Sequence, residues 1–148
     1  MSDSNGYTGR ILRVDLSSGH ISVVPTSDYA AFVGGRGIAA RIHWNEVPPH
    51  VGALDPENRL TFVTGPLVGF SGFASSRWQV CGKSPATAPE HFCYSNLGGT
   101  WGVTLKFTGY DGIIIHGRAA RPVYLLVEQT GAQLRDASHL WGRGAIEA

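Results

Sequence analysis

Residues 9–24 have the sequence GRILRVDLSSGHISVV and set the class of fold at the start of the chain. Apolar and β-branched residues fill both arms of this stretch, and Ser17-Ser18-Gly19 between them has the composition of a turn. The stretch therefore predicts a β-hairpin, and the question for the rest of the chain is how many further strands join it.

Strand-like runs also dominate the later sequence. β-Branched residues predict a buried strand over residues 59–64. Residues 77–81 predict another strand, which turns at residues 83–85 and returns antiparallel through residues 91–94. A three-stranded meander is expected from three later runs, residues 112–117, 123–128 and 133–136. The fold class is therefore mainly β, of the α+β type.

Two short helices are expected near the start. Ser27 or Asp28 can cap a helix over residues 29–33, and the glycines after it would stop it. A second helix is expected where three apolar residues share one face at the 3.6-residue period, namely Ile38, Ile42 and Val47. Pro48-Pro49 ends that helix.

The composition excludes several classes of function. A chain of 148 residues is one domain, and its 43% hydrophobic against 16% charged residues are typical of a globular protein. A net charge of +1 does not create the strongly positive potential that binding to a nucleic acid or an anionic membrane requires. The chain has neither an apolar stretch of membrane-spanning length nor a signal sequence, so a cytoplasmic protein is expected. Residues 1–6 are polar and are expected to be disordered.

Glycine is the unusual component, with 20 residues against an average share of about 7%. Asn96-Leu97-Gly98-Gly99 puts two glycines after a carboxamide. Consecutive main-chain amides there could form an anion-binding nest, although a turn that needs a positive φ explains the same pattern. No Gly-Lys-Ser comes after it, so this is not a nucleotide-binding P-loop.

Two arginines could serve such an anion site. Arg77 follows a run of small residues that would let its guanidinium reach a phosphate, and the alternative is an exposed arginine at a strand edge. Arg36, between glycines at a helix start, is a second candidate, with a solvated charge as the alternative. Trp101 could cover a flat cofactor, while the other tryptophans are expected in the core.

The remaining reactive side chains form no pattern of a known site. Cys81 and Cys93 have no metal-binding spacing and are interpreted as reduced core thiols. The six histidines include no pair four residues apart, so no helix presents a metal pair. Asp136, Ser138 and His139 lack the nucleophile elbow of a hydrolase.

Eight stretches together resemble, in the same order along the chain, the N-terminal domain of aldehyde ferredoxin oxidoreductases, the tungsten-pterin enzymes. They are GRILRVDLSSG (9–19), GGRG (34–37), DPENRL (55–60), TGPL (64–67), KSP (83–85), SNLGG (95–99), LKFTGYDG (105–112) and RDASHLWG (135–142). Residues 1–148 are therefore interpreted as one such domain, without the helical C-terminal domains of full-length members.

The resemblance implies a domain of two β-sheets that supports a tungsten, or molybdenum, bis-pterin cofactor. Arg77 then corresponds to an arginine that contacts the pterin, and Gly98 and Gly99 to glycines whose amides approach it. Asn96 corresponds to an asparagine whose main-chain carbonyl holds a magnesium ion between the pterin phosphates. No catalytic residue is assigned, and neither cysteine matches a ligand of the family's 4Fe-4S cluster.

The resemblance also implies partners. The family oxidises aldehydes to carboxylates and passes electrons through the cluster to ferredoxin, so this chain would be a subunit or fragment that works with helical catalytic domains, in a homo- or hetero-oligomer. By itself it should have little or no turnover. The alternative is a stand-alone, non-catalytic module that keeps the fold and binds a ligand or partner.

Overall fold

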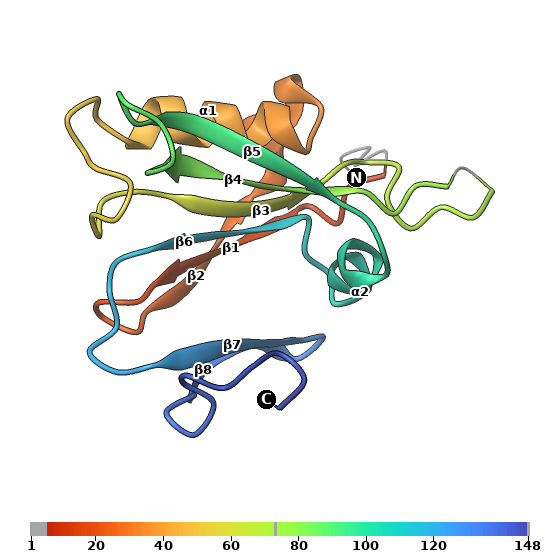
Figure 1. The fold of residues 1–148 in the computed structure, drawn as a ribbon. Coiled ribbons are helices and arrows are strands. Elements are labelled where there is room, and N and C mark those ends of the chain that lie inside the picture. Colours follow the sequence, from red (N-terminus) through yellow and green to blue (C-terminus); the bar gives the residue numbers. More distant parts are fainter. Residues whose placement is uncertain (1–5, 73, 148) are drawn as a thin grey trace.

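The computed structural model describes residues 6–72 and 74–147, which form two β-sheets and three short helices (Figure 1). The larger sheet has six strands in the order β2-β1-β6-β3-β4-β5, and β7 and β8 pair separately. The strands are β1 (Arg10–Asp15), β2 (Ile21–Pro25), β3 (Leu60–Thr64), β4 (Trp78–Ser84), β5 (His91–Leu97), β6 (Gly112–His116), β7 (Val123–Glu128) and β8 (Gly131–Asp136). The expected class, mainly β with two sheets and short helices, is confirmed.

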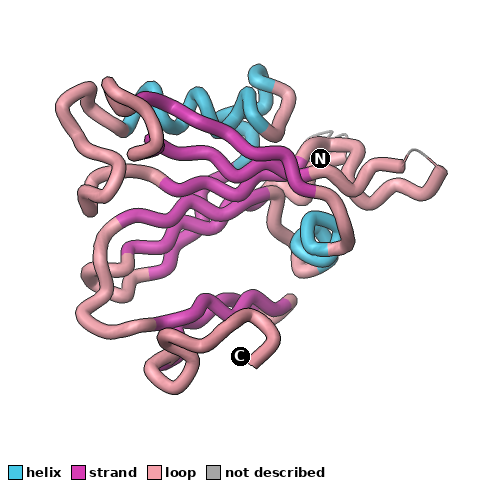
Figure 2. The backbone as a smooth tube through the Cα atoms, viewed as in Figure 1, coloured by secondary structure: helices cyan, strands magenta, loops and turns pink. Residues whose placement is uncertain are grey.

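Both faces of the six-stranded sheet are covered, so the domain has two cores (Figure 2). On one face lies α1 (Arg36–Glu46), whose Ile38, Ala39 and Ile42 are buried against the sheet. On the other face lie α2 (Trp101–Phe107) and the β7–β8 hairpin. Because successive side chains of a strand point to opposite faces, β1, β2, β3 and β6 each contribute side chains to both cores.

The N-terminal hairpin is confirmed, since β1 pairs antiparallel with β2. The helix expected over residues 29–33 is instead a 3-10 helix, η1 (Thr26–Phe32), and neither Ser27 nor Asp28 caps it. Its N-cap position is Pro25, and the segment ends at Val33, whose positive φ of 66° stops the helix after two turns. The second helix is confirmed as α1, with Val47 buried just beyond its end.

The predicted meander of three strands is wrong. β6 lies inside the large sheet, parallel to β1 and antiparallel to β3, while β7 and β8 form their own hairpin on the other layer. The composition of β6 gives the reason. Ile113 and Ile114 are adjacent in sequence and both buried, which requires cover on both faces and therefore a central strand.

The expectation that the remaining tryptophans lie in the core is correct for Trp78 alone, which is 8% exposed. Trp44 and Trp141 are 82% and 79% exposed. Trp101 is 39% exposed and starts α2, a helix that the sequence interpretation did not include. None of the helices in the described ranges is long and apolar enough to cross a membrane.

A buried carboxylate ties the start of the chain to the sheet. Asp111 accepts hydrogen bonds from the Thr8 and Gly9 amides at 2.9 Å, from the Thr26 hydroxyl at 2.7 Å and from the Lys106 ammonium at 2.7 Å. Lys106 also donates to the Gly6 carbonyl at 2.6 Å. Of the segment expected to be disordered, residues 1–5 lie outside the described residues.

Candidate cofactor-binding site

Strands β4 and β5 bring the predicted site residues to one end of the sheet. Their antiparallel register pairs Gln79 with Asn96 and, last, Trp78 with Leu97. Arg77 and Gly98 are therefore the residues at which the two strands leave the ladder. This pairing is the one expected from the sequence, except that β4 continues through Ser84 instead of turning at Lys83.

The loop after β5 exposes its backbone. For both Gly98 and Gly99, no heavy atom of the described residues, apart from the glycine itself and its two chain neighbours, lies within 4 Å of the position a Cβ would take. Gly99 has a φ of +78°, which explains glycine there on conformational grounds. The Gly98 carbonyl accepts a hydrogen bond of 3.3 Å from the indole nitrogen of Trp78, which fixes the loop to the sheet. A ligand could therefore reach this backbone closely.

Beside the loop, two carboxamides lie on the α1 side of the sheet. The Gln79 amide nitrogen donates to the Asn96 side-chain oxygen. The Gln79 side-chain oxygen is buried and has no hydrogen-bond partner among the described residues. A buried acceptor without a donor is costly, so this atom suits a ligand that brings an N–H or O–H group. Sequence reasoning missed Gln79, although its position two residues after Arg77 in a strand was a usable signal.

Both candidate arginines are exposed. Arg77 immediately precedes β4, and within residues 6–72 and 74–147 no ion pair or hydrogen bond of its side chain is found. Arg36 is the first residue of α1, and its guanidinium carbon lies 4.2 Å from the centre of the Tyr94 ring. Tyr94 is on β5, two residues before Asn96, so both side chains face the α1 side.

The two thiols are separated by the sheet. Cys81 pairs with Tyr94 and lies in the core under α1, where burial raises its pKa to about 11. Cys93, the neighbour of Tyr94, must face the other way and is only half-buried, so the prediction of a core position is wrong for it. Thiols on opposite faces of one strand pair cannot bind the same cluster.

The histidines are not grouped as a metal site. In the described part of the chain, no three His, Cys, Asp or Glu side chains are placed to hold a metal ion. His43 of α1 packs against Phe92 with ring centroids 5.0 Å apart, and burial lowers its pKa. A magnesium ion at Asn96 would therefore need most of its oxygen ligands from the cofactor, which is what phosphates would supply.

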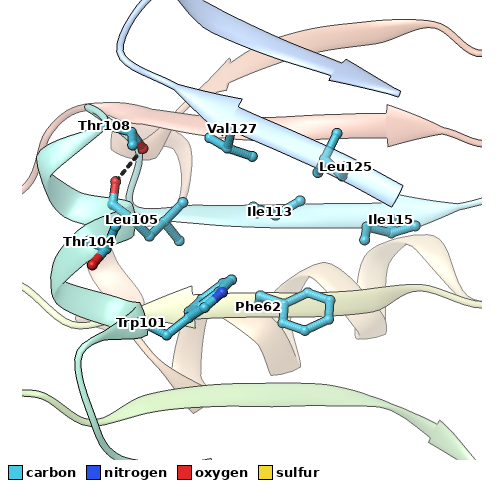
Figure 3. A pocket seen from close by; sticks show the side chains of 9 residues that line it. All are labelled: Phe62, Trp101, Thr104, Leu105, Thr108, Ile113, Ile115, Leu125 and Val127. Atoms are coloured by element: carbon cyan, nitrogen blue, oxygen red, sulfur yellow. Dashed lines mark hydrogen bonds between the residues drawn. The ribbon is translucent and has the colours of Figure 1, made fainter. Parts of the chain in front are cut away.

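A second feature, missed from the sequence, is an apolar pocket of about 270 Å³ on the opposite face (Figure 3). It lies between α2, the sheet and the β7–β8 hairpin. The Thr104 hydroxyl donates to the carbonyl of Thr100, the N-cap of α2, at 3.0 Å, and the Thr108 hydroxyl donates to the Leu105 carbonyl at 2.7 Å, so both protons are used by the helix itself. Its lining residues are Phe62, Trp101, Thr104, Leu105, Thr108, Ile113, Ile115, Leu125 and Val127.

Comparison with known proteins gives a consistent result. The family model of the aldehyde ferredoxin oxidoreductase N-terminal domain matches residues 11–148. A tungsten-containing aldehyde ferredoxin oxidoreductase of Pyrococcus furiosus is 40% identical over 144 residues, which are 96% of this chain and 24% of the relative. The WOR-like subunit of an aliphatic sulfonate oxidoreductase of the same organism is 38% identical over 146 residues, 95% of this chain and 23% of the relative.

A solved structure agrees with these relatives. The active-site complex BamBC of benzoyl coenzyme A reductase, with bound 1,5-dienoyl-CoA, superimposes with a TM-score of 0.90 at 41% identity. The match covers 97% of this chain and 22% of that one. The chain thus spans about a quarter of the length of the relatives it matches. The family match, the relatives and the similar fold agree that the chain belongs to the aldehyde ferredoxin oxidoreductase family and corresponds to its N-terminal domain.

Proposed function

We propose that this domain binds a tungstopterin cofactor at the end of β4 and β5 and presents it to the rest of a larger oxidoreductase. The observation that supports the proposal most directly is the meeting of Arg77, Asn96 and the open Gly98–Gly99 backbone at one end of one strand pair. Tungsten is named for the relatives, and the arginine and main-chain amides are the donors that the phosphates of a pterin cofactor require.

Each residue has a separate part in holding the cofactor. With the alternation of β4 continued one residue beyond the strand, the Arg77 side chain would point to the same side as Gln79 and Asn96, and its guanidinium would bind a phosphate bidentately there. The amides of Gly98 and Gly99 would donate to phosphate oxygens. The main-chain carbonyl of Asn96 would bind a magnesium ion shared with the phosphates. When bound, the tungstopterin supplies two-electron redox chemistry.

For the complete enzyme we propose the oxidation of an aldehyde to a carboxylate, with electrons leaving for ferredoxin through a 4Fe-4S cluster held elsewhere. Relatives named for aldehydes, for sulfonates and for a coenzyme A thioester match this chain at 38–41% identity. A domain that is equally similar in enzymes named for different substrates is expected to do what these enzymes have in common, which is to hold the cofactor. Substrate selection would then belong to the helical part of the enzyme.

The test is the cofactor content of the assembled enzyme, purified anaerobically from cells supplied with tungstate. Tungsten by mass spectrometry and pterin by fluorescence after oxidation should both be present in the wild type. Arg77→Ala should lower the pterin content several-fold. Arg135→Ala, which removes an exposed arginine from β8, is the matched control and should leave it unchanged. Wild-type enzyme free of pterin, or equal pterin in both variants, would contradict the proposal.

A further inference from the structure

The connection between β3 and β4 forms an arm that projects beyond the end of the sheet (Figure 1). The structure describes this arm over residues 65–72 and 74–76. The arm is held in shape by its own contacts. The Gly69 amide donates to the Ser75 carbonyl at 3.1 Å, and the Ser75 hydroxyl donates to the Phe70 carbonyl at 2.9 Å. The arm therefore has a defined conformation before anything binds to it.

Two large apolar side chains of the arm are exposed. Leu67 is 58% exposed and Phe70 is 52% exposed. Both belong to a run, residues 60–76, that contains no charged side chain at all. Leu54 is exposed as well, at 76%, but it is followed directly by the charged Asp55. An exposed apolar surface from which charges are missing is typical of a protein interface.

The arm lies at the end of the sheet where the cofactor is proposed to bind. It leads directly into Arg77. It also lies beside α2, because a Cβ on Gly69 would be 3.8 Å from the Cγ1 of Val103, which belongs to that helix. The same helix begins after the glycine loop with Trp101, which is 39% exposed. The arm and the start of α2 therefore place apolar side chains next to the proposed cofactor site.

We propose that the arm is the surface on which the rest of the oxidoreductase docks, and that Leu67 and Phe70 enter an uncharged apolar groove of that part. The inference rests on the proposed function, because a domain that presents its cofactor must meet the rest of the enzyme at this end. The relatives support this occupant. The matched domain is 24% of one and 22% of another, so most of each lies outside it. An arm that is already ordered loses little conformational freedom on docking.

Hydroxyl-radical footprinting read by mass spectrometry tests this, because the oxidation rate of a side chain follows its exposure. It is applied to the isolated chain and to the assembled enzyme. Leu67 and Phe70 should be oxidised readily in the isolated chain and at least fivefold more slowly in the assembled enzyme. Leu54 is the matched control. It lies in the loop that leads into β3, whereas the arm follows the end of β3, so its rate should change by less than about twofold.

A substitution pair gives a second readout. Leu67→Ser combined with Phe70→Ser should leave the thermal midpoint of the isolated chain within about 2 °C, because both side chains are more than half exposed there. In the assembled enzyme the same pair should lower the first unfolding transition by at least about 5 °C, because the docked side chains are lost. Leu54→Ser should leave both midpoints within about 2 °C.

Three footprinting results would overturn the inference. Unchanged rates for Leu67 and Phe70 in the assembled enzyme would show that nothing covers the arm. Rates that fall as the isolated chain is concentrated would show that a second copy covers it. Protection that is lost in the pterin-depleted Arg77→Ala enzyme would show that the cofactor itself covers it.

The proposed function is decided separately by the pterin content. An unprotected arm in an enzyme whose pterin depends on Arg77 would contradict the docking surface alone. A protected arm in a wild-type enzyme free of pterin would confirm the docking surface and contradict the cofactor site alone.

Discussion

The indole ring of Trp101 stacks on that of Trp78, with the centroids 4.0 Å apart and the planes inclined by 29°. Trp78 is the first residue of β4, and Trp101 begins α2 directly after the glycine loop. Trp78 therefore holds both ends of that loop to the sheet. Its indole nitrogen donates to the Gly98 carbonyl at one end, and its ring stacks on Trp101 at the other.

Trp101→Ala should destabilise the domain by about 1–3 kcal/mol, because it removes an aromatic pair and apolar area at the pocket. Urea unfolding followed by circular dichroism measures the change. Trp44→Ala is the control, since Trp44 is 82% exposed on α1, and it should alter stability by no more than about 0.5 kcal/mol. Equal losses in the two variants would show that the stack does not stabilise the loop.

Asp111 should make stability depend on pH. Burial by itself raises the pKa of this carboxyl, but the hydrogen bonds from Lys106, Thr26 and the Thr8 amide outweigh burial and lower the pKa below its ordinary value. Its contribution is therefore fully present above the unfolded pKa of about 3.9 and is lost as pH falls through the lower folded pKa. Unfolding free energy measured between pH 7 and pH 2 should fall in this acidic window.

Asp111→Asn should flatten that acidic dependence and cost about 3–5 kcal/mol at pH 7, because it leaves the Lys106 ammonium buried without its counter-charge. Adding Lys106→Gln to the same chain should restore part of the loss. Asp28→Asn, at an exposed position of η1, is the control for a change of net charge. An unchanged pH profile in Asp111→Asn would contradict this role for the carboxylate.

The two loop glycines should respond differently to substitution. Gly99→Ala forces a side chain onto a φ of +78° and should lower stability by about 1–2 kcal/mol. Gly98 is not at a positive φ, and the added Cβ would contact no other part of the described structure. Gly98→Ala should therefore leave the thermal unfolding midpoint nearly unchanged. Gly98→Val should nevertheless reduce the pterin content of the assembled enzyme, because its side chain occupies the space in which the cofactor would approach. Full pterin content in Gly98→Val would place the cofactor elsewhere.

The two thiols should react at very different rates. Cys93 is half-buried, whereas Cys81 is 1% exposed with a pKa raised to about 11 by burial, so its reactive thiolate is scarce at neutral pH. A disulfide exchange reagent at pH 8 should modify one thiol quickly and the second only after denaturant is added. Cys93→Ser should abolish the fast phase. Two equally fast thiols in the native protein would disprove the burial of Cys81.

Much of the fold follows from local patterns. The Ser17-Ser18-Gly19 turn, the apolar face of α1 and the return of β5 along β4 all involve neighbours in sequence, and each was predicted correctly. The position of β6 was not, because its partners β1 and β3 lie about 100 and 50 residues earlier. Pairing over such separations depends on how the whole chain packs, and no short-range signal records it.

The sequence by itself determined which residue types are available for an anion site, namely Arg77, Asn96 and the two loop glycines, because conformational freedom and charge belong to the residues. Only the tertiary structure decided what surrounds them. The strand register puts Gln79 beside Asn96, and the packing of α1 puts Arg36 over Tyr94. These contacts join segments that lie 17 and 58 residues apart in the chain. The first contact follows from the pairing of two neighbouring strands, but the second exists because α1 packs across one face of the sheet, which is a property of the assembled core and not of any local stretch.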